Sequence, residues 1–178
     1  MIQSLDLTQD YFTLFGLPRS QALDTEQLAA RYRELQGEVH PDRHAHLTDA
    51  EKRRAMQWAS YVNEAFLTLK DPLKRARYLL ELAGVDVHLE TNTAMPVEFL
   101  MEQMELREAV AEAKASGDID ALEARHRQLK RAIRDEHAAL QAALEAGEHV
   151  RAGELVRRLM FQEKLLQEIG DALEVLET

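Results

Sequence analysis

The segment between residues 40 and 46 holds the side chains best suited to chemistry, namely His40, Asp42, His44 and His46. Imidazole and carboxylate groups can hold a metal ion or transfer a proton, so a metal-dependent helical enzyme that uses the three histidines is one hypothesis. The spacing does not match a known ligand pattern, and the chain has no cysteine to supply a thiolate. No other catalytic motif stands out. We therefore expect no metal, no cofactor and no enzymatic activity.

The distribution of charge excludes several classes of partner. The net charge is −10, and from Gly84 onward 20 Asp and Glu residues stand against 11 Lys and Arg residues, whereas residues 1–83 are nearly balanced. An acidic second half argues against nucleic acids and anionic membranes as partners. The N-terminus lacks the basic and apolar regions of a signal peptide, and no apolar run approaches the ~18 residues of a membrane span. We expect a cytoplasmic protein.

Composition predicts an all-α fold. Seven glycines and four prolines occur in 178 residues, while Leu, Ala, Glu, Arg and Gln are abundant. One stretch, residues 84–95, has no helical period. It begins with Gly84 and ends before Pro96, which is the usual punctuation between two helices. We interpret it as a linker between one helical domain, residues 1–83, and a second, residues 96–178.

The first domain is expected to contain four helices, with a turn between the second and the third. Pro41 makes that turn, because it has no N–H and disfavours helix at the residue before it. The residues expected at the helix starts are Asp10, Asp24 or Thr25, Thr48 with Glu51 as a capping box, and Pro72. The expected apolar positions of the three longer helices are Leu28, Tyr32, Leu35, Val39, Ala55, Met56, Ala59, Val62, Phe66, Leu69, Ala76, Leu79, Leu80 and Ala83.

The second domain is predicted to be a three-helix bundle. Its helices span about residues 96–116, 118–146 and 148–176, and the short breaks between them imply antiparallel neighbours. We expect the central helix to bury Ile119, Leu122, Leu129, Ile133, Leu140 and Leu144. We expect the last helix to bury Leu155, Leu159, Leu166, Ile169, Leu173 and Leu176.

The first helix of this bundle has two apolar faces. At 100° per residue, one stripe consists of Phe99, Leu106, Val110 and Ala113 and suits a core. The second consists of Val97, Leu100, Met101 and Met104, and it is edged by Glu105 and Glu108. A bundle buries one face of each helix, so the second face must meet a partner, the first domain or water. Phe161 on the last helix also lies off its core stripe.

Three blocks of sequence occur in a characteristic order: residues 11–17, then His40-Pro41-Asp42, then residues 63–78, which begin Asn63-Glu64-Ala65-Phe66. Together they resemble the J-domain over about residues 10–80. The resemblance implies a helical hairpin that presents the His-Pro-Asp loop to the ATPase domain of a DnaK-type chaperone.

The roles of the J-domain residues follow from that resemblance. Asp42 would offer a carboxylate to an arginine of the chaperone, and Pro41 would stiffen the loop. Arg31 and Arg33, on the helix before the loop, would steer the chaperone electrostatically. The same helix also carries Glu34 and Glu38, so it is less basic than is usual for J-domains. This departure favours a dedicated chaperone partner.

The segment Phe99-Leu100-Met101-Glu102-Gln103-Met104-Glu105-Leu106-Arg107-Glu108 is similar to the signature of the HscB family, and so is the opening of the chain, residues 11–18. These proteins are J-type co-chaperones of iron–sulfur cluster biogenesis. The resemblance implies that the bundle binds the scaffold protein IscU and delivers it to the chaperone HscA, whose ATPase the J-domain stimulates. The residues implied in scaffold binding are Leu100, Met101, Met104, Glu105, Arg107, Glu108 and Phe161.

A second hypothesis within the same class is a general co-chaperone that serves DnaK with unfolded clients. Such proteins carry a glycine-rich linker, zinc repeats or a β-rich client domain, and the sequence has none of these. Some relatives in the HscB family carry a cysteine-rich zinc module at the N-terminus, which is also missing, so the resemblance implies no metal.

Overall fold

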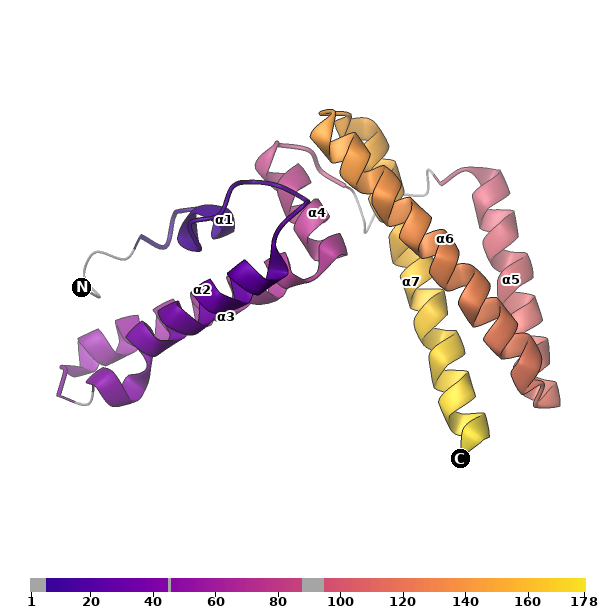
Figure 1. Ribbon diagram of the computed structural model, residues 1–178, viewed down its shortest axis with the longest axis horizontal. Helices are drawn as coiled ribbons and strands as arrows, with labels where there is room; N and C mark the ends of the chain where they lie inside the picture. Colours follow the sequence, from indigo (N-terminus) through magenta and orange to yellow (C-terminus); the bar gives the residue numbers. More distant parts are fainter. Residues whose placement is uncertain (1–5, 45, 88–94) are drawn as a thin grey trace. The chain divides into compact units, whose positions relative to one another are not determined.

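The computed structural model describes residues 6–44, 46–87 and 95–178. All regular elements within these residues are helices, so the predicted all-α class is confirmed (Figure 1). The chain divides into two compact units, Met1–Leu79 and Leu80–Thr178, which we call the N-terminal and C-terminal units. The division falls within helix α4, Pro72–Leu82. Residues 88–94 of the expected linker lie outside the described residues, so its limits stay a prediction.

The N-terminal unit is built on a helical hairpin. Helices α2 (Thr25–Val39) and α3 (Asp49–Lys70) lie side by side, and the 3-10 helix η2 (Pro41–His44) follows α2 in the turn between them (Figure 1). The short helix α1 (Tyr11–Leu14) packs against α3. Asp24 caps α2 by accepting hydrogen bonds from two backbone N–H groups. Thr48 and Glu51 form the expected capping box of α3.

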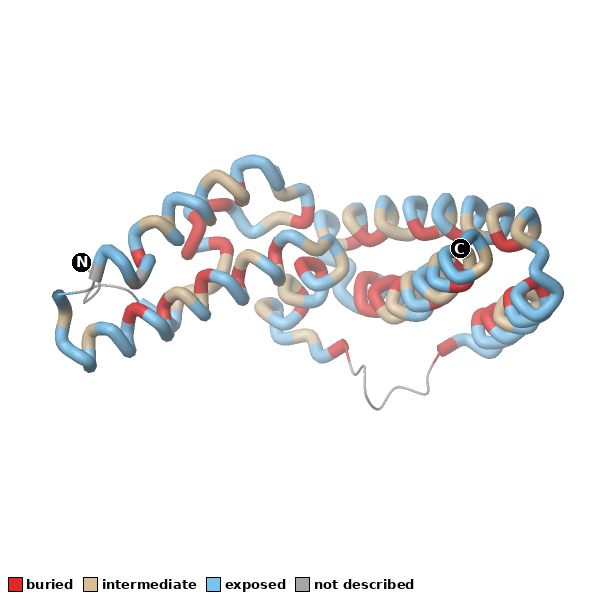
Figure 2. The backbone as a smooth tube through the Cα atoms, turned by 90° about the horizontal axis from the view of Figure 1, so that it is seen from below, coloured by how far each residue is buried: buried red, intermediate tan, exposed pale blue. Residues whose placement is uncertain are grey.

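The core of this unit follows one stripe along each helix (Figure 2). On α3 the buried side chains recur every three or four residues and are Ala55, Trp58, Val62, Ala65 and Leu69. Two expected core positions are wrong, because Met56 is 64% exposed and Ala83 lies exposed beyond the end of α4. Met56 is turned about 100° from Ala55, so it leaves the stripe and Trp58 enters the core instead.

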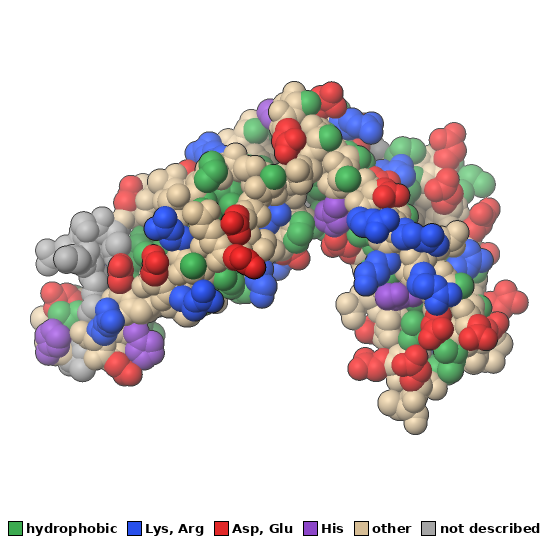
Figure 3. Space-filling view, in the orientation of Figure 1, with side chains coloured by type: hydrophobic (Ala, Val, Ile, Leu, Met, Phe, Trp, Pro, Cys, Tyr) green, Lys and Arg blue, Asp and Glu red, His purple; other side chains and the backbone are tan. Residues whose placement is uncertain are grey.

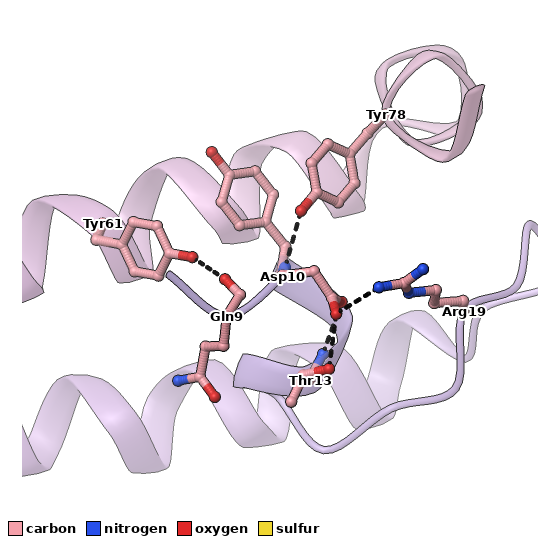
Figure 4. Close-up of polar contacts among 7 residues, drawn as sticks. Gln9, Asp10, Thr13, Arg19, Tyr61 and Tyr78 are labelled. Carbon is pink, nitrogen blue, oxygen red and sulfur yellow. Dashed lines mark hydrogen bonds and ion pairs between the residues drawn. The ribbon is translucent and has the colours of Figure 1, made fainter. Parts of the chain in front are cut away.

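A partly buried carboxylate, that of Asp10, holds α1 in place through a polar network (Figure 4). The Asp10 carboxylate caps α1 by accepting a hydrogen bond from the Thr13 N–H at 3.0 Å and another from the Thr13 hydroxyl at 2.8 Å. Arg19 forms an ion pair with the same carboxylate at 3.0 Å. Burial alone would raise the pKa of Asp10, but the hydrogen bonds from Thr13 and the charge of Arg19 hold it below its usual value.

Two tyrosine hydroxyls tie the start of α1 to α3 and α4 (Figure 4). The Tyr61 hydroxyl donates a hydrogen bond to the backbone carbonyl of Gln9, and the Tyr78 hydroxyl accepts one from the Tyr11 N–H at 3.0 Å. The rings of Tyr11 and Tyr78 stack with centroids 4.5 Å apart. Burial raises the pKa of Tyr61 to about 12, so its hydroxyl keeps its proton, and remains a donor, near neutral pH.

The C-terminal unit is the expected three-helix bundle, made of α5 (Val97–Ser116), α6 (Ile119–Glu145) and α7 (His149–Glu177). Gly117 and Gly147 follow α5 and α6 with φ of 67° and 72°, a left-handed conformation that glycine adopts without strain. These turns let each helix reverse within three residues. Helix α5 is the shortest of the three, and its buried residues are Phe99, Gln103, Val110 and Ala113.

The expected core of α6 and α7 is confirmed in part. Leu122, Leu129, Ile133 and Leu140 of α6 are buried, as are Leu155, Leu159 and Ile169 of α7, whereas Ile119, Leu144, Leu166, Leu173 and Leu176 are only half-buried. On α7, Leu165 and Ala172 are buried where Leu166 and Leu173 were expected. Helix α7 packs against both other helices, and it meets α5 through the pairs Phe99–Phe161 and Arg107–Glu168.

Replacing Asp10 tests the network around α1. Asp10→Asn should lower the free energy of unfolding by about 1 kcal/mol at neutral pH, because it removes the charge that Arg19 pairs with. The folded-state pKa of Asp10 is depressed, so its contribution is present above the unfolded-state pKa of about 4 and is lost as the pH falls through the folded-state pKa. Urea unfolding at about pH 7 and about pH 3 measures the difference.

The matched control is Asp24→Asn, since asparagine caps helices as well as aspartate does and Asp24 holds only backbone N–H groups. This variant should stay within about 0.5 kcal/mol of the parent chain at both pH values. An Asp10→Asn loss of equal size at both pH values would contradict the assigned role of the charge.

Candidate functional site

The His-Pro-Asp loop presents a carboxylate to solvent. His40 ends α2 in an extended conformation, and η2 then turns the chain so that the Asp42 side chain is 91% exposed. The Asp42 N–H donates a hydrogen bond to Nδ1 of His40 at 3.3 Å, and the Arg43 N–H donates to the His40 carbonyl at 3.0 Å. These bonds fix the turn from within. The Asp42 carboxylate also lies 3.5 Å from Nδ1 of His40, but both side chains are well exposed, so this contact adds little to the turn.

The two arginines of α2 do not share a face. Arg31 and Arg33 are both exposed, but residues two apart on a helix lie about 200° from each other. Arg33 lies on the side away from the core residue Leu28, whereas Arg31 lies on the flank with Glu34, to which it pairs at 3.9 Å. Both side chains of that pair are largely exposed, so the pair adds little stability.

The histidine cluster offers no recognisable metal site in the described part of the chain. Among the side chains that the structure describes, no group of three His, Cys, Asp or Glu residues is placed to hold a metal ion. The side chains of Pro41 and His44 lie outside that set.

None of the described helices is long and apolar enough to cross a bilayer.

The second apolar face of α5 is exposed. Met101 and Met104 are 56% and 62% exposed, and Leu100 is 36% exposed, whereas Phe99 on the core side is 3% exposed. Glu105 and Glu108 are exposed along the same face. Methionine is flexible and polarisable, so an exposed methionine pair with a charged border suits an adaptable protein contact.

Helix α7 extends this face with Phe161, which is 39% exposed. The rings of Phe161 and the buried Phe99 pack edge to face, with their centroids 6.1 Å apart. The Arg158 guanidinium lies over the Phe99 ring, 4.7 Å from its centroid. Arg158 is itself held by Glu136 of α6 at 3.0 Å. The orientation of Phe161 therefore depends on all three helices. We call Leu100, Met101, Met104, Glu105, Glu108 and Phe161 together the α5–α7 face.

Arg107 lies at the border of the α5–α7 face and bridges two helices. One of its terminal nitrogens contacts both carboxylate oxygens of Glu168 on α7, at 2.9 and 3.2 Å. Its side chain is 38% exposed, so it remains in reach of a partner while it holds α5 against α7. Sequence reasoning did not find Glu168, Arg158 or Glu136, because residues this far apart show no spacing signal until the register of the helices is known.

The matched families agree with this geometry. A family model described as the DnaJ domain matches residues 10–78, and one described as the HSCB C-terminal oligomerisation domain matches residues 95–170. A hairpin with an exposed His-Pro-Asp loop, followed by this bundle, defines a J-domain co-chaperone, a protein that works with an HSP70-type chaperone.

Individual relatives narrow the class. A co-chaperone protein HscB homolog from Azoarcus sp. (strain BH72) is 61% identical over 175 residues, which cover 98% of this chain and 99% of the relative. The solved structure of chaperone HscB from Vibrio cholerae has 38% identity and a TM-score of 0.86 and covers 94% of this chain and 99% of that one. Human co-chaperone protein HscB has 31% identity and a TM-score of 0.87, covering 93% of this chain and 83% of that one. The chain belongs to the HscB family of co-chaperones, as the resemblance predicted.

Truncating the two exposed methionines tests whether they belong to the core. Met101→Ala combined with Met104→Ala should change the free energy of unfolding by less than about 1 kcal/mol, because both side chains are exposed. Phe99→Ala, on the opposite side of the same helix, should lower it by about 3–5 kcal/mol. Chemical denaturation followed by circular dichroism measures both. A methionine variant as unstable as the Phe99 variant would show that this face is buried in solution.

Proposed function

We propose that this chain binds the iron–sulfur scaffold protein IscU on the α5–α7 face, delivers it to the DnaK-type chaperone HscA and stimulates the ATPase of that chaperone. The result would be faster maturation of iron–sulfur proteins, in the cytoplasm. The observation that carries the proposal is that one chain combines an exposed His-Pro-Asp loop with an exposed, methionine-rich face on a separate unit.

The chaperone contact is assigned to His40, Pro41 and Asp42, with Arg31 and Arg33 in support. The exposed Asp42 carboxylate suits a bidentate contact with an arginine of the chaperone. Because the turn is already held by hydrogen bonds of His40, docking would order little additional backbone. Arg33, on the outer side of α2, is the better placed of the two arginines for long-range steering.

The stimulation needs no catalytic group or cofactor from this chain. A partner that binds the hydrolysis-competent conformation of the chaperone more tightly than its resting conformation raises the population of the competent one. The contribution of this chain is therefore differential binding through Asp42 and the neighbouring loop. The chemistry of ATP hydrolysis stays within the chaperone.

The scaffold contact is assigned to the α5–α7 face together with Arg107. Leu100, Met101 and Met104 would supply the apolar centre of the interface, and Phe161 would supply an aromatic anchor. Glu105 and Glu108 would form a polar rim, which favours a scaffold surface that places basic groups around an apolar patch.

Removing the charge of Asp42 tests the chaperone contact. Asp42→Asn should abolish the stimulation of HscA ATP hydrolysis and leave the helical content intact, because the side chain is exposed and the turn is fixed by hydrogen bonds that the Asp42 and Arg43 N–H groups donate to His40. The control is Asp49→Asn, an exposed carboxylate in the first turn of α3, which should stimulate normally. Steady-state ATPase assays with HscA, and in parallel with DnaK, measure the effect. Normal stimulation by Asp42→Asn would remove the proposal, and stronger stimulation of DnaK than of HscA would favour the general co-chaperone.

Truncating the exposed methionines also tests the scaffold contact. Met101→Ala with Met104→Ala should weaken IscU binding by at least about tenfold, since central apolar anchors contribute 1 kcal/mol or more each. Stimulation of the chaperone in the absence of scaffold should not change. Val150→Ala with Val175→Ala removes two exposed apolar side chains elsewhere in the same unit and should leave binding as it is. Calorimetric titration measures all three proteins, and equal losses in both double variants would contradict the assigned face.

A further inference from the structure

The outer side of α6 carries a basic surface inside an acidic domain. Lys and Arg side chains gather on the C-terminal unit in Figure 3. On α6, Arg127, Lys130, Arg131 and Arg134 are exposed and lie within an arc of about 100° around the helix axis. This line is on the side opposite the buried leucines of α6, such as Leu129 and Leu140. We call these four residues the α6 basic stripe.

The stripe stands out against the charge of its surroundings. Residues 124–134 contain five Lys and Arg residues and no Asp or Glu, whereas the remainder of residues 84–178 contains six Lys and Arg residues and 20 Asp and Glu residues. Asp120 and Glu123 precede the stripe and Asp135 follows it, so the basic surface is confined to about two turns of helix.

The cations of the stripe are not used to hold the bundle together. Other arginines of this unit bridge helices, as Arg107 does with Glu168 and Arg158 does with Glu136. Within the described part of the chain, the stripe's one ion pair is Arg127 with Glu123, at 3.9 Å and well exposed. Like charges three and four residues apart oppose helix formation, so the stripe lowers the helical stability of α6. In the described part of the chain, it supplies no ion pair between helices that would offset this cost.

We propose that the α6 basic stripe is a docking site for an acidic segment of a protein partner, separate from the α5–α7 face. The stripe spans eight residues, from Arg127 to Arg134, and rises about 10 Å along the helix, which matches two turns of a helix with carboxylates at intervals of three and four residues. Three of its four cations are arginines, whose planar guanidinium groups bind carboxylates bidentately. Because the stripe and the α5–α7 face lie on different helices, both surfaces can be occupied at once.

The distribution of charge also argues against a nucleic acid or an anionic membrane as the partner of the stripe. A nucleic acid or an anionic membrane extends far beyond 10 Å and would meet the acidic residues at both ends of the stripe and the acidic remainder of the unit. A short acidic protein segment meets only the stripe. The small size of the basic surface therefore favours a protein partner.

The test uses the full-length chain and a fluorescently labelled helical peptide with glutamates at positions i, i+3, i+4 and i+7. Lys130→Glu with Arg131→Glu and Arg134→Glu should weaken peptide binding by about tenfold or more. The control, Lys114→Glu with Arg151→Glu and Lys164→Glu, makes the same change in net charge at exposed sites of α5 and α7 and should weaken it by less than about threefold. If charge reversal unfolds α6, the neutral variant Lys130→Gln with Arg131→Gln and Arg134→Gln removes the same positive charges without adding negative ones, and it should also weaken peptide binding.

Further measurements distinguish an acidic protein segment from other possible occupants of the stripe. Duplex DNA and phosphatidylserine vesicles should bind more weakly than the peptide, and tighter binding of either would overturn the proposal. Equal weakening in the stripe and control variants would overturn it too, because only net charge would then matter. Sedimentation should show the same mass for parent and stripe variants, since a lower mass for the variants would make the stripe a contact between two copies of this chain. A saturating amount of peptide should leave IscU affinity unchanged.

Discussion

Each helix of this protein can bury only one stripe of its surface, and this constraint shapes both units. In the hairpin, one stripe on α3 packs against α2 and leaves Met56 outside. In the bundle, α5 turns Phe99 inward and must leave Met101 and Met104 in solvent. An apolar residue that departs from the stripe of its helix is therefore either tolerated singly or available to a partner, and on α5 several of them occur together.

The sequence predicted best what depends on neighbouring residues. Helix ends were foreseen because caps act over three or four residues, as with Thr48 and Glu51. The exposure of Met101 and Met104 was foreseen because it depends only on the turn of one helix. The same reasoning placed the side chains of His40 and Asp42 in an exposed turn, because Pro41 disfavours the continuation of the helix that precedes this turn.

The sequence predicted poorly what depends on how distant segments meet. On α7, Leu165 is buried and Leu166 is only half-buried. Which of two neighbouring leucines faces the core depends on how α5 and α6 pack on α7, and a periodicity calculated for one helix contains no such information. The pairing of Arg107 with Glu168 joins residues 61 positions apart.

The short helix α5 also has a consequence for how the bundle opens. Its buried residues include Gln103, whose side-chain oxygen has no hydrogen-bond partner among the described groups, and Gln162 of α7 is in the same position. Helices α6 and α7 are longer, and they pack against each other more extensively than either of them packs against α5. Detachment of α5 is thus the least costly partial unfolding of this unit, and the helix offered to partners is the one that can readjust most easily.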